Sequence, residues 1–141
     1  MQRTQFSIIV PGYLIAVISS ALCATLLIGI AGYSTYEHLD YLPIILFSIF
    51  LMIGFFIFVT AAPGFFFTVY LASKHDSHFI SVYIIGGAIN ALLGYSVMTT
   101  LTGGNFTNLD ALPLISAFAG AFGGWAYYKF RKVILNMKGI A

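Results

Sequence analysis

The motif Leu-Asp-Tyr-Leu-Pro at residues 39–43 decides the fold of this chain, because a close copy, Leu-Asp-Ala-Leu-Pro, follows at residues 109–113. Working outward at the same offset of 70 residues, more identities lie on both sides of the motif: Tyr13 and Tyr83, Ile15 and Ile85, Ala21-Leu22 and Ala91-Leu92, Ile45 and Ile115, Gly54 and Gly124. Such self-similarity indicates a repeated structural unit. We expect two tandem helical hairpins, with repeat one over residues 7–72 and repeat two over residues 77–138.

The composition indicates an integral membrane protein. The chain is 60% hydrophobic and 7% charged, whereas soluble domains carry roughly a quarter charged residues. A domain of this size keeps much of its surface exposed, so this chain cannot cover itself with a water-facing surface. The net charge of +2 is too small and dispersed to favour nucleic acid as a partner. The single Cys23 excludes an internal disulfide framework.

Four apolar stretches are predicted as transmembrane helices, since a bilayer core needs roughly 20 apolar residues per helix. They cover residues 9–31, 43–62, 79–99 and 113–128. The first starts near Pro11 and is longer than a cleavable signal sequence. Asp40 and Asp110 are expected to cap the second and fourth helices. The prediction is one all-α membrane domain over residues 1–141.

Residues 63–72 leave two interpretations open. Pro63 and Gly64 interrupt the second apolar stretch, and a Phe-rich segment follows. One straight helix over residues 42–72 would be about 46 Å long, too long for an untilted crossing. Either the helix kinks at Pro63 and continues, or it ends there and the Phe-rich segment lies at the membrane interface.

The distribution of cations predicts the orientation. The turns at residues 33–41 and 100–112 contain no Lys or Arg, and all six cations fall elsewhere: Arg3, Lys74, Lys129, Arg131, Lys132 and Lys138. The positive-inside rule then places both termini in the cytoplasm, and we expect a bacterial inner membrane. The basic tail is expected to run along an anionic membrane surface. The inner interface is expected to be marked by Tyr83, Trp125, Tyr127 and Tyr128.

Small residues at four-residue spacing predict where the helices pack closely. In the third helix these are Gly86 and Gly94, which share a face with Asn90, and Gly87 and Ala91 beside them. In the fourth helix they are Ser116, Gly120 and Gly124. We expect the third helix to pack on the fourth within one chain, or the fourth helices of two copies to pack together.

Asn90 is the one strongly polar side chain near the middle of a predicted span. It could contact a substrate or an ion. The alternative, which we favour, is an interhelical hydrogen bond that holds a small-residue contact together, a common arrangement in membrane helices.

The sequence contains no convincing catalytic, cofactor or metal site. His75 and His78 have too few neighbouring ligands for zinc, and Glu37 with His38 is similarly isolated. No acidic or basic side chain lies within a predicted span, and such residues usually mark ion-coupled transport. We therefore expect a non-enzymatic accessory or assembly component that associates with itself or with a larger membrane protein in the lipid bilayer. The alternative is a small oligomeric channel or carrier for a neutral or weakly polar solute.

Overall fold

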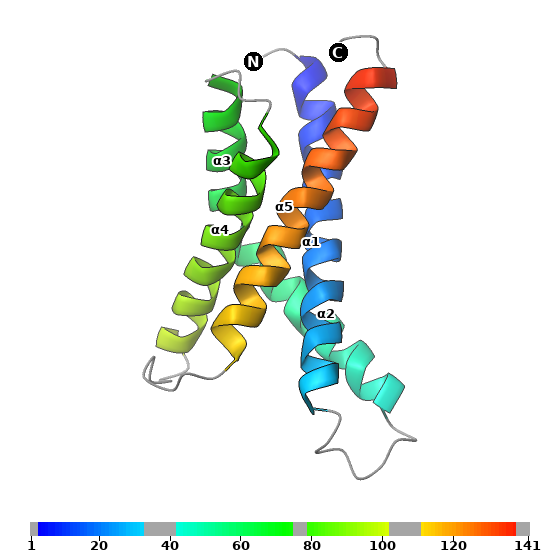
Figure 1. Ribbon diagram of the computed structural model, residues 1–141, viewed down its shortest axis with the longest axis vertical. Coiled ribbons are helices and arrows are strands. Elements are labelled where there is room, and N and C mark those ends of the chain that lie inside the picture. Colours follow the sequence, from blue (N-terminus) through cyan, green and yellow to red (C-terminus); the bar gives the residue numbers. More distant parts are fainter. Residues whose placement is uncertain (1–2, 33–41, 75–78, 102–110, 138–141) are drawn as a thin grey trace.

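The computed structural model describes residues 3–32, 42–74, 79–101 and 111–137, nearly all of which lie in helices (Figure 1). The expected all-α fold is confirmed for these residues. The five helices are α1 (Arg3–Gly32), α2 (Leu42–Thr60), α3 (Ala62–Lys74), α4 (Ile80–Leu101) and α5 (Leu112–Met137). The predicted caps Asp40 and Asp110 lie outside the described residues.

Three helices are long and apolar enough to cross a membrane. The stretches are Ile8–Ile30 in α1, Leu42–Thr60 in α2 and Ile80–Thr100 in α4. α5, with 26 residues, is not among them, because its glycines, its tyrosines and Lys129 lower its mean hydropathy. Among the described residues, α2 has no buried side chain, and Phe55 on it is 73% exposed. Apolar exposure on this scale is expected of a helix that meets lipid rather than water. The findings are consistent with a helical membrane protein.

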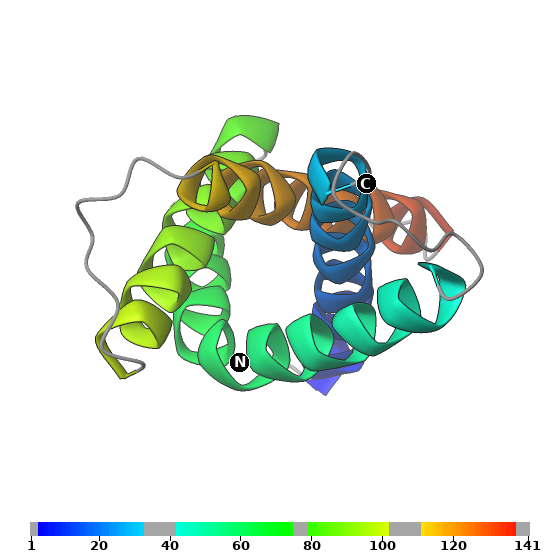
Figure 2. The ribbon, with the colours of Figure 1, turned by 90° about the horizontal axis from the view of Figure 1, so that it is seen from below.

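The helices pack side by side in a closed ring. α5 packs against α4 and against α1, α1 packs against α2, and α3 packs against α4. α2 and α3 follow each other end to end and complete the ring. Figure 2 shows this arrangement along the bundle. Because α2 contacts α4 only slightly, the ring surrounds a space that its helices do not fill.

One end of the bundle collects the cations of the described residues. α1 begins there and α5 ends there, and the end of α3 and the start of α4 lie at the same level (Figure 1). Arg3 is therefore at this end with Lys74, and the last third of α5 brings Lys129, Arg131 and Lys132 towards it. We refer to it below as the basic end.

The helix breaks at Ala61, two residues before Pro63. Ala61 N still donates to Ile57 O (2.9 Å), and Phe65 N donates to Ala61 O (2.8 Å), so hydrogen bonding continues through the bend. Pro63 falls in the first turn of α3, where its missing N–H is tolerated. α3 then lies alongside α4 with Val69 buried. The Phe-rich segment thus belongs to the bundle.

Pro11 does not lie near a helix start. α1 begins at Arg3, so Pro11 lies inside the helix. The apolar span itself begins at Ile8, close to the expected start, but the polar residues that precede it also adopt helical structure and extend the helix back to Arg3.

Candidate binding cavity between the helices

A cavity of about 550 Å³ lies inside the ring of helices. All five helices contribute to its wall, and most of the lining side chains are apolar. The lining residues that the structure describes include no Asp, Glu, Lys, Arg or His. A volume of this size is typical of sites for small organic molecules, roughly 300–1,000 Å³.

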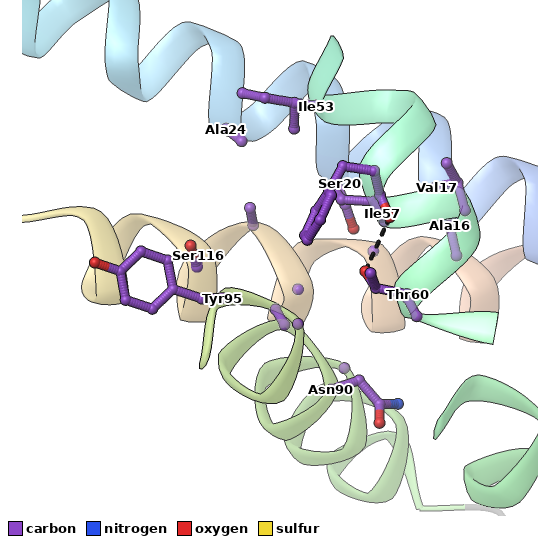
Figure 3. A pocket seen from close by; sticks show the side chains of 18 of the residues that line it. Ala16, Val17, Ser20, Ala24, Ile53, Ile57, Thr60, Asn90, Tyr95 and Ser116 are labelled. Carbon is purple, nitrogen blue, oxygen red and sulfur yellow. Dashed lines mark hydrogen bonds between the residues drawn. The ribbon is translucent and has the colours of Figure 1, made fainter. Parts of the chain in front are cut away.

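A few neutral polar groups from several helices line the cavity. Figure 3 shows Ser20 of α1, Thr60 of α2, Asn90 and Tyr95 of α4 and Ser116 of α5 around the same space. The hydroxyl of Thr60 donates to the carbonyl oxygen of Phe56 (2.9 Å), which is the dashed line in Figure 3. Hydroxyl and amide groups can hydrogen-bond a neutral ligand without introducing a charge.

Four aromatic rings line the part of the cavity nearer the basic end. The ring of Phe65 lies 4.9 Å from that of Tyr13 and 4.9 Å from that of Tyr127, and Tyr127 lies 5.5 Å from Tyr83. We call these residues the aromatic cluster. Its tyrosines are buried, with Tyr83 3% and Tyr127 2% exposed. These distances are within the preferred range for aromatic pairs.

The aromatic cluster corrects one sequence-based expectation. Tyr83 and Tyr127 were expected to mark a membrane interface, but both side chains point between the helices and line the cavity. Trp125, on the opposite side of α5, is 39% exposed. An interfacial aromatic residue needs contact with headgroups, so burial between helices excludes that role for Tyr83 and Tyr127. Sequence pattern alone does not separate the two situations.

The cavity continues from the aromatic cluster towards the opposite end of the bundle. There it is lined by Ile28 near the end of α1, Met98 near the end of α4 and Leu112 at the start of α5. Ile49 contributes from the first half of α2. The cavity therefore extends from the aromatic cluster to the end of the bundle opposite the basic end.

The hydroxyl of Tyr13 supports the break between α2 and α3. It donates to the carbonyl oxygen of Phe58, three residues before Ala61. A helix break removes the intrahelical partner of nearby carbonyl groups, and in a membrane these groups must be satisfied by other protein atoms. Tyr13 thus links α1 to α2 next to the break between α2 and α3.

Asn90 packs against the other side of the same break. Its side chain lies so close to Gly64 that a Cβ added there would come within 2.5 Å of Asn90 Cγ. Asn90 Nδ2 donates to Thr68 Oγ1 at 3.4 Å, a long hydrogen bond. Asn90 also lines the cavity. The position is compatible with both earlier interpretations, because one side chain bridges two helices and borders an open space.

The two faces of α4 on which small residues were singled out contact different helices. Gly86 and Gly94 face Thr68 of α3 and Thr60 of α2, where an added Cβ would lie 2.5 Å and 3.2 Å from the nearest threonine atom. Gly87 and Ala91 face α5. Figure 3 shows the crossing of α4 and α5 below the cavity.

The crossing of α4 and α5 brings their backbones into direct contact. An added Cβ at Gly120 would lie 2.5 Å from the Cβ of Ala91 and closer still to the carbonyl oxygen of Gly87. At Gly124 it would lie 2.7 Å from the carbonyl carbon of Tyr83. Small residues permit this approach, which favours van der Waals packing between membrane helices. Ser116, on the same helix, borders the cavity.

Two contacts of α1 with α5 were not anticipated. Gly123 approaches Ser20 and the carbonyl oxygen of Ala16, at 2.8 Å from an added Cβ. Gly12 lies against the ring of Tyr127, at 2.6 Å. The spacing of Ala16 and Ser20 is itself small-xxx-small, so this signal was present in the sequence of the first helix.

No group of three or more potential metal ligands occurs among the described residues. His75, His78, Glu37 and His38 lie outside them. Cys23 is half-buried beside an apolar groove that Leu27, Leu114, Phe118 and Phe122 line between α1 and α5.

Comparison of the chain with protein families, with curated proteins and with solved structures found no match.

Proposed function

We propose that this chain is a membrane channel or carrier for a neutral, weakly polar solute, which binds in the cavity between the helices. The observation that carries the proposal is the uncharged cavity wall to which every helix contributes. Apolar walls favour burial of a largely apolar molecule. The scattered hydroxyl and amide groups suit a ligand with one or two polar atoms.

The absence of charged groups from the described wall argues against an ion as the solute. Transfer of an ion into an apolar environment is very costly unless a counter-charge or several polar ligands receive it. The described polar groups, such as Ser20, Thr60 and Ser116, are neutral and are spread over all five helices. They offer hydrogen bonds to a neutral molecule rather than a coordination shell.

The proposed membrane arrangement has four crossings in two tandem hairpins. α1 and α4 are single crossings, α2 and α3 together form a broken crossing, and α5 is the fourth. The close packing of α5 between α1 and α4 supports this assignment. Both copies of the repeated tyrosine bond to the second helix of their hairpin: Tyr13 to Phe58 and Tyr83 to Arg131.

The proposed orientation places the basic end in the cytoplasm of a bacterial cell, with the chain in the inner membrane. The gathering of Arg3, Lys74 and the cations of α5 at one end supports it through the positive-inside rule. A reporter enzyme that works only in the periplasm tests the orientation. It should be inactive when fused after Lys74, and activity at that position would contradict the arrangement.

The test of solute binding is the recovery of a bound molecule from purified protein. The chain is purified from native membranes in mild detergent, and extracted small molecules are identified by mass spectrometry. We expect one neutral molecule per chain in the wild type and a strong loss in Ser116→Phe, which fills the cavity. Phe118→Leu is the matched control, because Phe118 is 68% exposed and outside this cavity.

A second experiment distinguishes transport of the molecule from binding alone. The recovered molecule is loaded into liposomes that contain the protein, and its efflux is compared with that from protein-free liposomes. Faster efflux that Ser116→Phe abolishes supports transport. If the wild type retains no neutral molecule in stoichiometric amount, the proposal fails.

An accessory or assembly role remains the second candidate. Its support is α2, which buries no residue and exposes large side chains such as Phe47 (61%) and Phe55 (73%). A larger membrane protein or a second copy could pack on this helix. Stoichiometric co-purification of another membrane protein, lost in a Phe47→Ser/Phe55→Ser variant, supports this role. Recovery of the chain alone contradicts a stable heteromeric complex.

A further inference from the structure

The last third of α5 concentrates positive charge in a short stretch. Lys129, Arg131 and Lys132 are three of the six Lys and Arg residues in the chain. Tyr128 lies within this group, and its ring is 5.8 Å from that of Tyr83 on α4. Since α5 packs closely on α4, the group borders a seam between two helices rather than an isolated helix surface.

Arg131 is held in a fixed position at this seam. Its Nη1 donates to the hydroxyl oxygen of Tyr83, and its guanidinium carbon lies 5.7 Å from the centroid of the Tyr83 ring. The side chain is half-buried. A guanidinium group has five N–H donors in a planar fork that matches the oxygens of a phosphate. The hydroxyl of Tyr83 orients the fork but does not neutralise its charge.

The described residues contain no carboxylate that could neutralise these cations. The four acidic residues of the chain are Glu37, Asp40, Asp76 and Asp110, and all lie outside the described residues. Among the described residues, the three clustered cations therefore have no carboxylate partner, and this excess of positive charge favours an anionic partner.

The surroundings of the cluster favour a lipid over a soluble anion. On the neighbouring face of α5, Lys129 Nζ lies 5.8 Å from the ring centroid of Trp125, and Trp125 stacks on Phe122 at 5.3 Å. Both rings are exposed, 39% and 45% respectively. Trp residues at membrane interfaces lie at headgroup level. The cations thus stand next to an apolar face that can receive acyl chains.

The start of α4 adds to the positive potential of this seam. α4 begins at Ile80, one turn before Tyr83. The N-terminus of a helix carries a partial positive charge and exposes N–H donors. This contribution is secondary to the cations, because it arises at every helix start.

We propose that Arg131 and Lys132 bind the phosphate of an anionic phospholipid at the seam between α4 and α5, with Tyr83 positioning the guanidinium group. Basic groups between transmembrane helices at the cytoplasmic surface are suited to such headgroups. Arg131 and Lys132 do not line the cavity, and Tyr83 is the one residue that borders both the cavity and the proposed lipid site. The inference does not depend on the solute that the cavity binds.

The experiment measures lipid binding to the full chain in detergent. Thermal unfolding is followed while phosphatidylglycerol, phosphatidylcholine or inorganic phosphate is added in separate titrations. We expect phosphatidylglycerol to raise the melting temperature more than phosphatidylcholine does, and inorganic phosphate to have no comparable effect. Arg131→Gln should weaken the apparent affinity for phosphatidylglycerol about fivefold, which corresponds to about 1 kcal/mol per basic residue near a membrane surface.

Lys129→Gln is the matched control, because it removes the same charge two residues away, where the side chain lies over Trp125. It should weaken binding less than Arg131→Gln. If the two variants weaken binding equally, the attraction is a diffuse surface effect and the site is wrong. If Arg131→Gln does not fold, Lys132→Gln replaces it in the same comparison. Equal stabilisation by both phospholipids, or by inorganic phosphate, also overturns the assignment.

Discussion

Alanine substitutions at Gly124 and Gly54 compare a position in contact with a helix backbone with a position that has room for a methyl group. Gly124 of α5 and Gly54 of α2 occupy equivalent places in the sequence, 70 residues apart. At Gly124 an added Cβ would lie 2.7 Å from the carbonyl carbon of Tyr83 and 3.3 Å from Cα of Ile84. At Gly54 it would lie 3.6 Å from the Cβ of Ala21, an ordinary van der Waals contact.

The size of the expected effects follows from which atoms must move. Backbone atoms of α4 cannot rotate away from the new methyl group at Gly124, so the two helices must separate. Overpacking of this kind costs about 1–3 kcal/mol, a decrease of about 5- to 150-fold in the ratio of folded to unfolded protein. Gly54→Ala should be neutral or stabilising by up to about 1 kcal/mol, because alanine is the better helix former.

The assay is equilibrium unfolding of both variants in mixed micelles, followed by circular dichroism while a denaturing detergent is added. The prediction is a lower free energy of unfolding for Gly124→Ala than for the wild type, and no decrease for Gly54→Ala. Equal free energies of unfolding in the two variants would falsify the close α4·α5 crossing. A decrease in Gly54→Ala alone would mean that α2 packs more tightly than its exposure indicates.

Three further predictions concern the cavity and the helix break. Tyr13→Phe should lower the free energy of unfolding by about 1 kcal/mol, because the carbonyl of Phe58 loses its donor; an unchanged value would contradict that contact. Asn90→Ala should cost only about 0.6 kcal/mol, the average for hydrogen bonds between membrane helices, since its bond is long; unfolding of the variant would make Asn90 essential to the fold. Ser116→Cys, in a Cys23→Ser background, should react with a membrane-impermeant maleimide from the side opposite the basic end. Labelling from the basic end would show that the cavity opens on that side instead.

The sequence predicted the helices well because their length and apolarity are local properties. Three of the expected spans correspond closely to α1, α2 and α4. The fourth corresponds to the start of α5, which continues without a break through the basic residues to Met137. Lys and Arg are good helix formers, so the basic residues do not interrupt the helix. The start of α1 was misjudged because helix termini depend on a few weak local preferences.

The spacing of small residues alone did not predict which helix each of them contacts. Small residues at Gly87 and Gly120 indicated close packing, and the structure brings them together in one chain. Gly86 and Gly94 have the same kind of spacing, but they contact threonines of α3 and α2, respectively. A four-residue period identifies a helix face but carries no information on the neighbour, because many membrane helices offer an equally small complementary face.

The cavity arises from the geometry of a single break, which is why the sequence did not reveal it. The bend at Ala61 lets α3 pack on α4 while α2 packs on α1, so that the two helices together form one side of the ring (Figures 1 and 2). Tyr13 and Asn90 contact this bend from opposite helices. The residues that fix the break are therefore the ones that determine the shape of the proposed solute site, and stability and solute binding should respond together when they are changed.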